Sequence, residues 1–457
     1  MRRRFGPILL VLGILLSGCA WAQNDTGTPD TTAPTQPGPK PAYTYPDATP
    51  SLDFLNGAVE NSSITLGIGA GFSYLTNAYS NVNNSQGRWQ FQVTPSISIQ
   101  QFRPRLKWNL GYSGGYMTYT QPSSVASGNY NLFSQDANAG FLWQLAPHWQ
   151  LAANDNFVYS ADPFSSYLTH VGSPTLNNPN PVTYSPVTQY TLNNGLMTLT
   201  DQPTKVDTLA FTGTTNLRRT STYNLVTSVP FYNLISYGGR ASYSHKLSPR
   251  LSLGVGYNYN SLDFGAGQQR SGIQTIPFTV DYLIRPNMSI SGWIGPEYTS
   301  TKTSGIPVLV NGQIVLATIY SSQWSGAGGV TFAWRGLRNS FNAGYMRGVS
   351  DGGGVIATSQ SNAVDGSYRR MLTAKMNLTL DARYTHLVST SVSSRTYDYS
   401  DFGAILGYKL TKSLTATARY AYANYNRSNL FLVGRGNYHD NIIGAMLNYT
   451  WNHPLGR

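Results

Sequence analysis

The side chains most often used in catalysis or metal binding are few in this chain and lie apart in the sequence. No two of the six histidines have the H-x-x-x-H spacing that places two imidazoles on one metal ion. Cys19 is the only cysteine, which excludes both a disulfide within the chain and a cysteine-based metal site. A hydrolase that uses His386 or His439 with a nearby serine is a competing class, but no G-x-S-x-G motif supports it. We therefore predict no enzyme activity, no catalytic residue, no metal and no cofactor. The histidines are His148, His170, His245, His386, His439 and His453.

Charged side chains are sparse, yet their spacing follows a pattern. They make up 11% of the 457 residues, against about a quarter in an ordinary soluble domain. The net charge is +12, but the basic residues stand singly rather than in clusters, so we predict no nucleic-acid partner. Alternate positions along the strand-like runs place seven cations and two acids on the polar face. These are Lys107, Arg240, Lys246, Lys375, Arg383, Lys409 and Arg419, with Asp281 and Asp381.

The elements that would position these charges are runs of alternating apolar and polar residues. In residues 63–74, Ile64, Leu66, Ile68, Ala70, Phe72 and Tyr74 share one face, and Thr, Gly and Ser occupy the other. Residues 89–100 repeat the pattern, with Trp, Phe, Val and Ile opposite Gln, Thr and Ser. Period-2 alternation over about ten residues is typical of a transmembrane β-strand, which faces lipid on one side and water on the other.

Eighteen such runs predict an all-β fold, a transmembrane antiparallel up-and-down β-barrel spanning residues 61–451. The even number lets both ends of the barrel lie on the periplasmic side. We expect tight periplasmic turns at FRPR, LAPH, LRRT, LSPR, IRPN, RGLR and LTKS, and long external loops near 161–205 and 301–321. Gly352, Gly353 and Gly354 are expected to form an extracellular turn, since no helix follows as in a phosphate-binding loop.

Three places fit this pattern badly. Asp155 falls on the lipid-facing side of its strand, which predicts either a bulge or a position near the outer rim. Pro277 and Pro296 interrupt strand-like runs and should mark bulges or lost ladder hydrogen bonds. The strand expected at 222–232 has the weakest alternation.

The N-terminal segment predicts export. Arg2, Arg3 and Arg4 precede an apolar stretch, so residues 1–22 read as a signal peptide. Cleavage after Gly18 would leave Cys19 as a lipidated N-terminus, whereas the A-x-A rule favours cleavage after Ala22, and both remain open. Residues 23–60 are rich in Pro and Thr and predict a periplasmic tether, either a plain spacer or a docking segment for a periplasmic partner. Residues 452–457 are expected to be a C-terminal extension.

Two segments each contain a strand, a short basic turn and a second strand with Tyr-rich alternation. They are SYSHKLSPRLSLGVGYNYN (242–260) and GYKLTKSLTATARYAYANYN (407–426). Together with the exported start, they resemble the outer-membrane β-barrel porins of Gram-negative bacteria, including barrels associated with exopolysaccharide or exosortase systems. The resemblance implies integral insertion in the outer membrane. It also implies a terminal aromatic residue for assembly, whereas here Trp451 is followed by NHPLGR.

A barrel of this size leaves an aqueous channel. We therefore expect a porin-like channel for passive diffusion of small hydrophilic solutes, with an anionic bias if the cations line the pore. Trp293 is the one inward tryptophan by this count and suggests a sugar-stacking surface, while most Tyr and Trp should form girdles at the lipid interface. A barrel that exports or anchors an exopolysaccharide and a structural or adhesin-like barrel are the alternatives. The sequence leaves the oligomeric state open.

Overall fold

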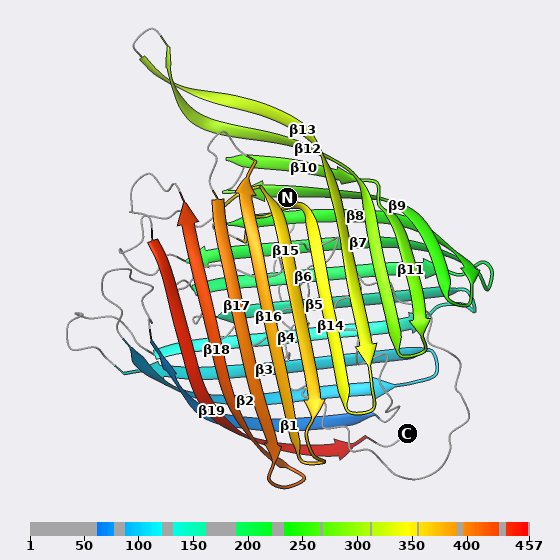
Figure 1. The fold of residues 1–457 in the computed structure, drawn as a ribbon, viewed down its shortest axis with the longest axis vertical. Helices are drawn as coiled ribbons and strands as arrows, with labels where there is room; N and C mark the ends of the chain where they lie inside the picture. The colour runs from blue at the N-terminus through cyan, green and yellow to red at the C-terminus, as the bar shows by residue number, and fades with distance from the viewer. Residues whose placement is uncertain are drawn as a thin grey trace, which may run out of the picture.

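The computed structural model shows an all-β protein whose strands wrap into one barrel (Figure 1). It describes residues 62–76, 87–120, 131–160, 189–221, 233–265, 268–310, 313–353, 356–390, 396–428 and 436–455. The predicted signal peptide, Cys19 and the whole predicted tether lie outside these residues. Within the described part of the chain, no helix is long and apolar enough to cross a membrane.

Nineteen strand elements form one antiparallel sheet. They are β1 (Ser63–Leu75), β2 (Arg88–Phe102), β3 (Leu106–Tyr119), β4 (Asn131–Gln144), β5 (Trp149–Ser160), β6 (Gln189–Asp201), β7 (Asp207–Ser221), β8 (Leu234–Ser248), β9 (Leu251–Phe264), β10 (Gln269–Thr275), β11 (Phe278–Arg285), β12 (Met288–Val310), β13 (Gln313–Arg335), β14 (Asn339–Ser350), β15 (Ser359–Met371), β16 (Met376–Ser389), β17 (Thr396–Lys409), β18 (Leu414–Ser428) and β19 (Gly436–Pro454).

The sheet closes on itself because β1 pairs with both β2 and β19. Leu66 lies opposite Ile97 on one side and opposite Trp451 on the other. The elements β10 and β11 lie end to end between β9 and β12, so the nineteen described elements occupy eighteen positions around the barrel. The predicted closed antiparallel barrel of about eighteen strands is confirmed.

The two ends of the barrel differ in their connections. At one end, eight joints of two to five residues link successive strands, and Ser63 lies opposite Pro454, so the two ends of the barrel wall meet there. By the usual arrangement of bacterial barrels, this is the periplasmic end. The eight joints are residues 103–105, 145–148, 202–206, 249–250, 286–287, 336–338, 372–375 and 410–413.

The two faces of the wall are chemically unlike. On β1, the predicted apolar face points outward: Leu66, Ile68 and Phe72 are exposed, whereas Ser73 is buried on the inner face. The same alternation continues on β2, where Trp89 and Phe91 are exposed and Gln90 is buried. Tyr and Trp side chains of the predicted girdles are also exposed on the outside, among them Tyr112, Trp143, Tyr257, Tyr408, Tyr449 and Trp451. An apolar outer belt around a polar interior is the arrangement that a lipid bilayer requires.

The sequence prediction was wrong about two loops. Residues 161–205 were expected to be loop, but β6 occupies 189–201 and pairs with β5 and β7. The LRRT sequence, expected as a periplasmic turn, lies within β7 near its opposite end. Residues 301–321 were also expected to be loop, but β12 and β13 extend through them as a long hairpin that projects beyond the rim (Figure 1). The strand expected at 222–232 lies outside the described residues.

The two prolines sit together at one interruption. Ile276 and Pro277 separate β10 from β11, as predicted for Pro277. Pro296 lies beside this break and accepts a hydrogen bond from the Ile276 amide at 3.2 Å. In an antiparallel sheet, the N–H and the C=O of one residue point toward the same neighbouring strand. Pro296 has no N–H, and on this side its neighbour is the break between β10 and β11, so no ladder hydrogen bond within a strand pair is lost. An added Cβ at Gly295 would overlap the Ile276 carbonyl oxygen, so the close approach requires glycine there.

Other differences concern single positions. Residues on β5 pair with β4 and β6 without a register shift, so Asp155 sits in a regular strand and the expected bulge is absent from it. The last strand continues to Pro454, and the Leu455 amide donates to the Ser62 carbonyl at 2.7 Å. Residues 452–454 therefore belong to the barrel wall rather than to an extension.

Candidate functional site

The inner wall carries the charged side chains that the sequence places on the polar face. Arg240 on β8, Arg383 on β16 and Arg419 on β18 are 8%, 7% and 8% exposed, while their strand neighbours Tyr384 and Tyr420 belong to the outer face. The strand alternation also turns Lys107, Lys246, Lys409, Asp281 and Asp381 inward. Lys375 lies in the periplasmic turn between β15 and β16.

Arg419 is held by a polar row that crosses the closure of the barrel. Its guanidinium donates to the Ser73 hydroxyl at 3.4 Å, and that hydroxyl donates to Gln90 Oε1 at 2.8 Å. Between Arg419 and Ser73 lies Gly444 on β19. An added Cβ there would stand 3.0 Å from Arg419 Nε and 2.9 Å from the Ser73 Cβ. Glycine at this position therefore leaves the space through which the guanidinium reaches β1.

Two of the predicted cations have acidic neighbours. Arg240 interacts electrostatically with Asp281 on β11. Arg383 does so with Asp381 on its own strand and with Asp401 on β17, which lies directly opposite in register. At these two places the inner wall therefore carries neighbouring opposite charges rather than a cation alone.

The sequence prediction missed several inner charges. Arg88 and Arg218 are 6% and 2% exposed on the inner side of β2 and β7. Strict alternation along each strand would have found them, because they precede outward Trp89 and Arg219. The missed acids of the inner wall are Asp136, Glu297, Asp365, Asp401 and Asp440.

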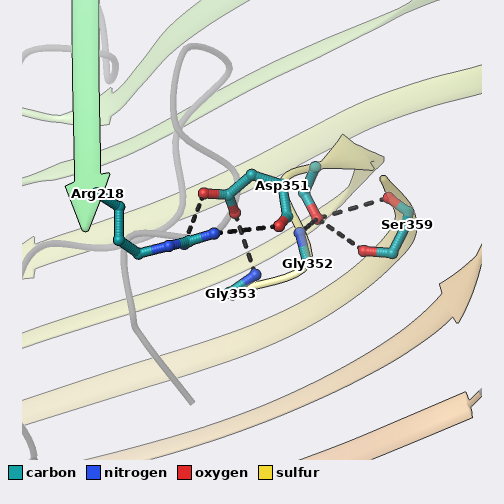
Figure 2. Close-up of polar contacts among 6 residues, drawn as sticks. Arg218, Asp351, Gly352, Gly353 and Ser359 are labelled. Carbon is teal, nitrogen blue, oxygen red and sulfur yellow. Dashed lines mark hydrogen bonds and ion pairs between the residues drawn. The ribbon is translucent and has the colours of Figure 1, made fainter. Parts of the chain in front are cut away.

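Figure 2 shows how the connection between β14 and β15 is tied to the barrel interior. Arg218, near the end of β7, donates to Asp351 Oδ2 at 2.8 Å, and both side chains are buried. The Gly353 amide donates to the other Asp351 carboxylate oxygen at 3.1 Å. Arg218 and Asp351 lie 133 residues apart in the chain. The connection therefore folds inward and reaches β7, several strands around the barrel.

The far side of this connection is fixed to β10. The Thr358 hydroxyl is hydrogen-bonded to the Ser271 hydroxyl and accepts from Gln269 Nε2 at 3.1 Å. Ala357 of this connection joins apolar residues of the neighbouring strands in one buried cluster. The others are Leu234, Leu262, Phe264, Ile273 and Val349. The connection thus packs on the inner ends of β7 to β10 and crosses the barrel interior at this end. Its described residues, 351–353 and 356–358, are called the inner turn.

Two glycines give the inner turn its path. Gly352 and Gly353 have φ of 62° and 61°, a left-handed conformation that other L-residues rarely adopt. An added Cβ at Gly352 would also overlap the Ile356 carbonyl oxygen. The expected turn is present at Gly352 and Gly353, but it packs into the barrel instead of standing outside. Gly354 lies outside the described residues.

Trp293 lies on the inner alternation of β12, beside Gly329 on β13. An added Cβ at Gly329 would lie 2.9 Å from the indole nitrogen, so the ring covers the glycine. No group of three or more His, Cys, Asp or Glu among the described residues could hold a metal ion. The polar atoms of the inner wall can exchange hydrogen bonds and charge contacts with a passing solute.

No family model matches the sequence, and no curated protein matches it. Among solved structures, OccAB2 of Acinetobacter baumannii is 13% identical, with 86% of this chain and 98% of that chain covered and a TM-score of 0.41. OccK8 (OprE) of Pseudomonas aeruginosa is 11% identical, with 87% and 99% covered and a TM-score of 0.39. A BenF-like porin from Pseudomonas fluorescens Pf-5 is 9% identical, with 86% and 100% covered and a TM-score of 0.43.

The chain is an integral β-barrel of the outer-membrane type. Its own closed pairing and its two unlike faces establish this. This is the architecture that the sequence predicted, and the apolar outer belt is a surface suited to contact with lipid.

Proposed function

We propose that this protein is a porin-like channel through which small hydrophilic solutes diffuse passively. The observation that carries the proposal is the placement of arginine, aspartate and glutamine side chains on the inside of a closed wall whose outside is apolar. A charge on the lipid side of such a wall costs about 2–4 kcal/mol for Arg or Lys at the bilayer midplane. An inner wall built this way is useful only if water and polar solutes enter it, because an interior meant to be filled is more cheaply packed with apolar side chains.

We further propose a bias toward solutes that carry a carboxylate or another anionic group. Arg240, Arg383 and Arg419 lie on the inner wall with 7–8% of each residue exposed, and their positive charge favours anions in the lumen. The inner acids moderate this bias, since Asp281 and Asp401 lie beside two of these arginines. The expected selectivity is therefore weak, with anions preferred over cations by a small factor rather than cations being excluded.

Planar-bilayer recording under a salt gradient tests both parts. Reconstituted protein should give steady open-channel steps with a reversal potential of anionic sign. Arg240→Ser, Arg383→Ser and Arg419→Ser together should move the reversal potential toward the cationic side. Arg219→Ser, which removes an exposed cation from the outer face, is the matched control and should leave it unchanged. An unchanged reversal potential in the triple variant would remove the charge filter, and an absence of conductance in folded protein would remove the channel.

The exopolysaccharide-associated and adhesin-like alternatives stay predictions from sequence, and nothing in the described residues favours either. The possible lipidation of Cys19 and a periplasmic partner for residues 23–60 also stay predictions.

A further inference from the structure

One acidic residue lies on the outer face of the barrel, within its apolar belt. Asp155 alternates with buried, inward Asn154 on β5, whose outward positions run from Trp149 to Tyr159. It stands six positions from Trp149, about 15 Å along the membrane normal at about 3.3 Å per residue and a tilt of about 40°. The apolar band of such barrels is about 25 Å tall, so Asp155 lies near its middle.

The neighbours of Asp155 are polar as well. Asn193 on β6 donates to Asp155 Oδ1 at 3.0 Å. Gly195 is directly opposite Asp155 in register, and Thr215 on β7 is opposite Gly195. A Cβ added at Gly195 would lie 2.6 Å from Thr215 Oγ1 and 3.5 Å from Asp155 Oδ1. A carboxylate, an amide and a hydroxyl thus gather on a surface that hydrocarbon would otherwise cover, which is unfavourable for each of them.

Small residues surround this polar group. Ala137, Ala139 and Ala153 lie on its β4 and β5 side. Gly213 and Gly239 lie on its β7 and β8 side, and a Cβ added at either would meet nothing within 4 Å. Farther along the same strands, large apolar side chains are exposed on this face, as they are elsewhere on the outer belt. They include Phe133, Met197, Phe211 and Tyr237.

We propose that the outer face of β4 to β8 around Asp155 is not a lipid-facing surface but an interface with a second copy of this chain. The face carries an acceptor, Asp155, and donors, Asn193 and Thr215, within neighbouring strands, which is the self-complementarity that a two-fold contact needs. Its small residues let two barrel walls approach closely, as small residues do between membrane helices. Five strands about 4.8 Å apart, across a band about 25 Å tall, offer about 600 Å² per copy. Two copies would bury about 1,200 Å², within the range of specific interfaces.

Cysteine cross-linking in isolated outer membranes tests the contact. Gly213→Cys places a thiol in the proposed interface, and Ala445→Cys places one on the outer face of the opposite wall. After oxidation, Gly213→Cys should migrate as a reducible dimer on a non-reducing gel, whereas Ala445→Cys should stay monomeric. The wild-type chain, treated in the same way, shows any background from Cys19. Equal dimer formation at both positions would overturn the proposal, because the contact would not be specific to this face. Monomer at both positions would also overturn it, and a different membrane protein would then be the occupant of this face.

The role of Asp155 is tested in detergent, where folded barrels are recognised by their heat-modifiable gel migration. Asp155→Leu should keep that migration but weaken self-association about tenfold or more, because it leaves the partner's donors unpaired. Asp155→Asn keeps the size and an acceptor oxygen and should retain most of the dimer. If Asp155 faced lipid, Asp155→Leu would leave the oligomeric state unchanged and make the barrel more resistant to unfolding. The conductance of each copy does not depend on dimer formation. A result that refutes the interface therefore leaves the proposed channel function standing, and the reverse also holds.

Discussion

A guanidinium shielded from water needs an anionic acceptor, and the contact between Arg218 and Asp351 supplies one across the lumen. The pair is 2.8 Å long with side chains only 2% and 8% exposed. Removing one partner of a buried ion pair lowers the free energy of unfolding by more than the intact pair contributes, because the other charge is left buried without a partner. The contact therefore holds the inner turn in place more firmly than a surface ion pair would.

Asp351→Asn should weaken the protein through this contact. We expect a loss of about 3–5 kcal/mol in the free energy of unfolding, as found for broken buried pairs, measured by denaturant titration of the folded band in detergent. Release of the inner turn should also raise the single-channel conductance. Asp263→Asn is the matched control, since it breaks the Arg270–Asp263 pair, also 2.8 Å long but with the Arg270 side chain 65% exposed. That variant should lose about 1 kcal/mol or less. Equal losses in the two variants would contradict the role given to Arg218.

Gly444→Ala should disturb the arginine that lies over it. The added methyl group would stand 2.8 Å from the Phe72 carbonyl oxygen and 3.0 Å from Arg419 Nε. Overpacking of this kind costs about 1–3 kcal/mol, and the displaced guanidinium should alter the reversal potential. Gly403→Ala is the control, because a Cβ at that inner position on β17 meets nothing within 4 Å. Unfolding titrations and bilayer recordings of the two variants should therefore differ, and identical behaviour would show that the space over Gly444 is not limiting.

For single residues, the sequence could predict which face of the wall a side chain lies on but not which residues it contacts. Period-2 alternation fixes the face of Arg240, Arg383 and Arg419 once a strand is located. The partner of Arg218 depends on the path of the inner turn, 133 residues further along the chain. Alternation carries no information about that path.

Among the elements, strands with one apolar and one polar face were located from sequence, and β6 was not. Its inner positions include Tyr190, Leu192 and Leu196, while Asn193 and Thr191 face outward, so the usual pattern is lost. If β6 lies in the proposed interface, Asn193 faces outward because the outer face meets protein there instead of lipid. The same contact with protein explains why β6 lacks the usual alternation and was not found from the sequence.

The long hairpin of β12 and β13 was missed because residues 301–321 were assigned to a loop for their Ser, Thr, Asn and Pro content. Ile306 to Val310 pair with Ala317 to Gln313 and, among the described residues, with no other strand. Replacing residues 304–318 with a two-residue Asn-Gly turn between the paired residues Thr303 and Ile319 should therefore leave the barrel intact. We expect unchanged heat-modifiable migration, unchanged unfolding midpoint and unchanged conductance. Removing residues 189–221, which takes out β6 and β7, should abolish all three, since those strands carry ladder contacts on both sides. A hairpin deletion that prevents folding would show that the projecting part guides assembly.

For the whole molecule, the even number of positions and the closure of the wall were predictable from sequence, even though β6 was missed. A transmembrane sheet cannot leave an edge in lipid, because unpaired backbone groups have no water to bond there. That requirement constrains the total more tightly than the alternation of any single run. It does not fix where the closing strand ends, and β19 indeed runs past the predicted end of the barrel.

The closing strand allows this requirement to be tested directly. Thirteen residue pairs join β1 to β19, and ending the chain after Trp451 removes only the pairs of Asn452, His453 and Pro454. Ten pairs remain, and Trp451 becomes a terminal aromatic of the kind that the porin resemblance implies for assembly. We expect this shortened protein to reach the outer membrane and to show heat-modifiable migration like the full chain. Ending the chain after residue 435 removes β19 and leaves the edges of β1 and β18 unpaired, so this variant should yield no folded barrel and should be degraded by added protease. Failure of the first variant would give the last residues a role beyond pairing, whereas a folded barrel from the second would mean that the wall can close between β1 and β18 without its nineteenth element.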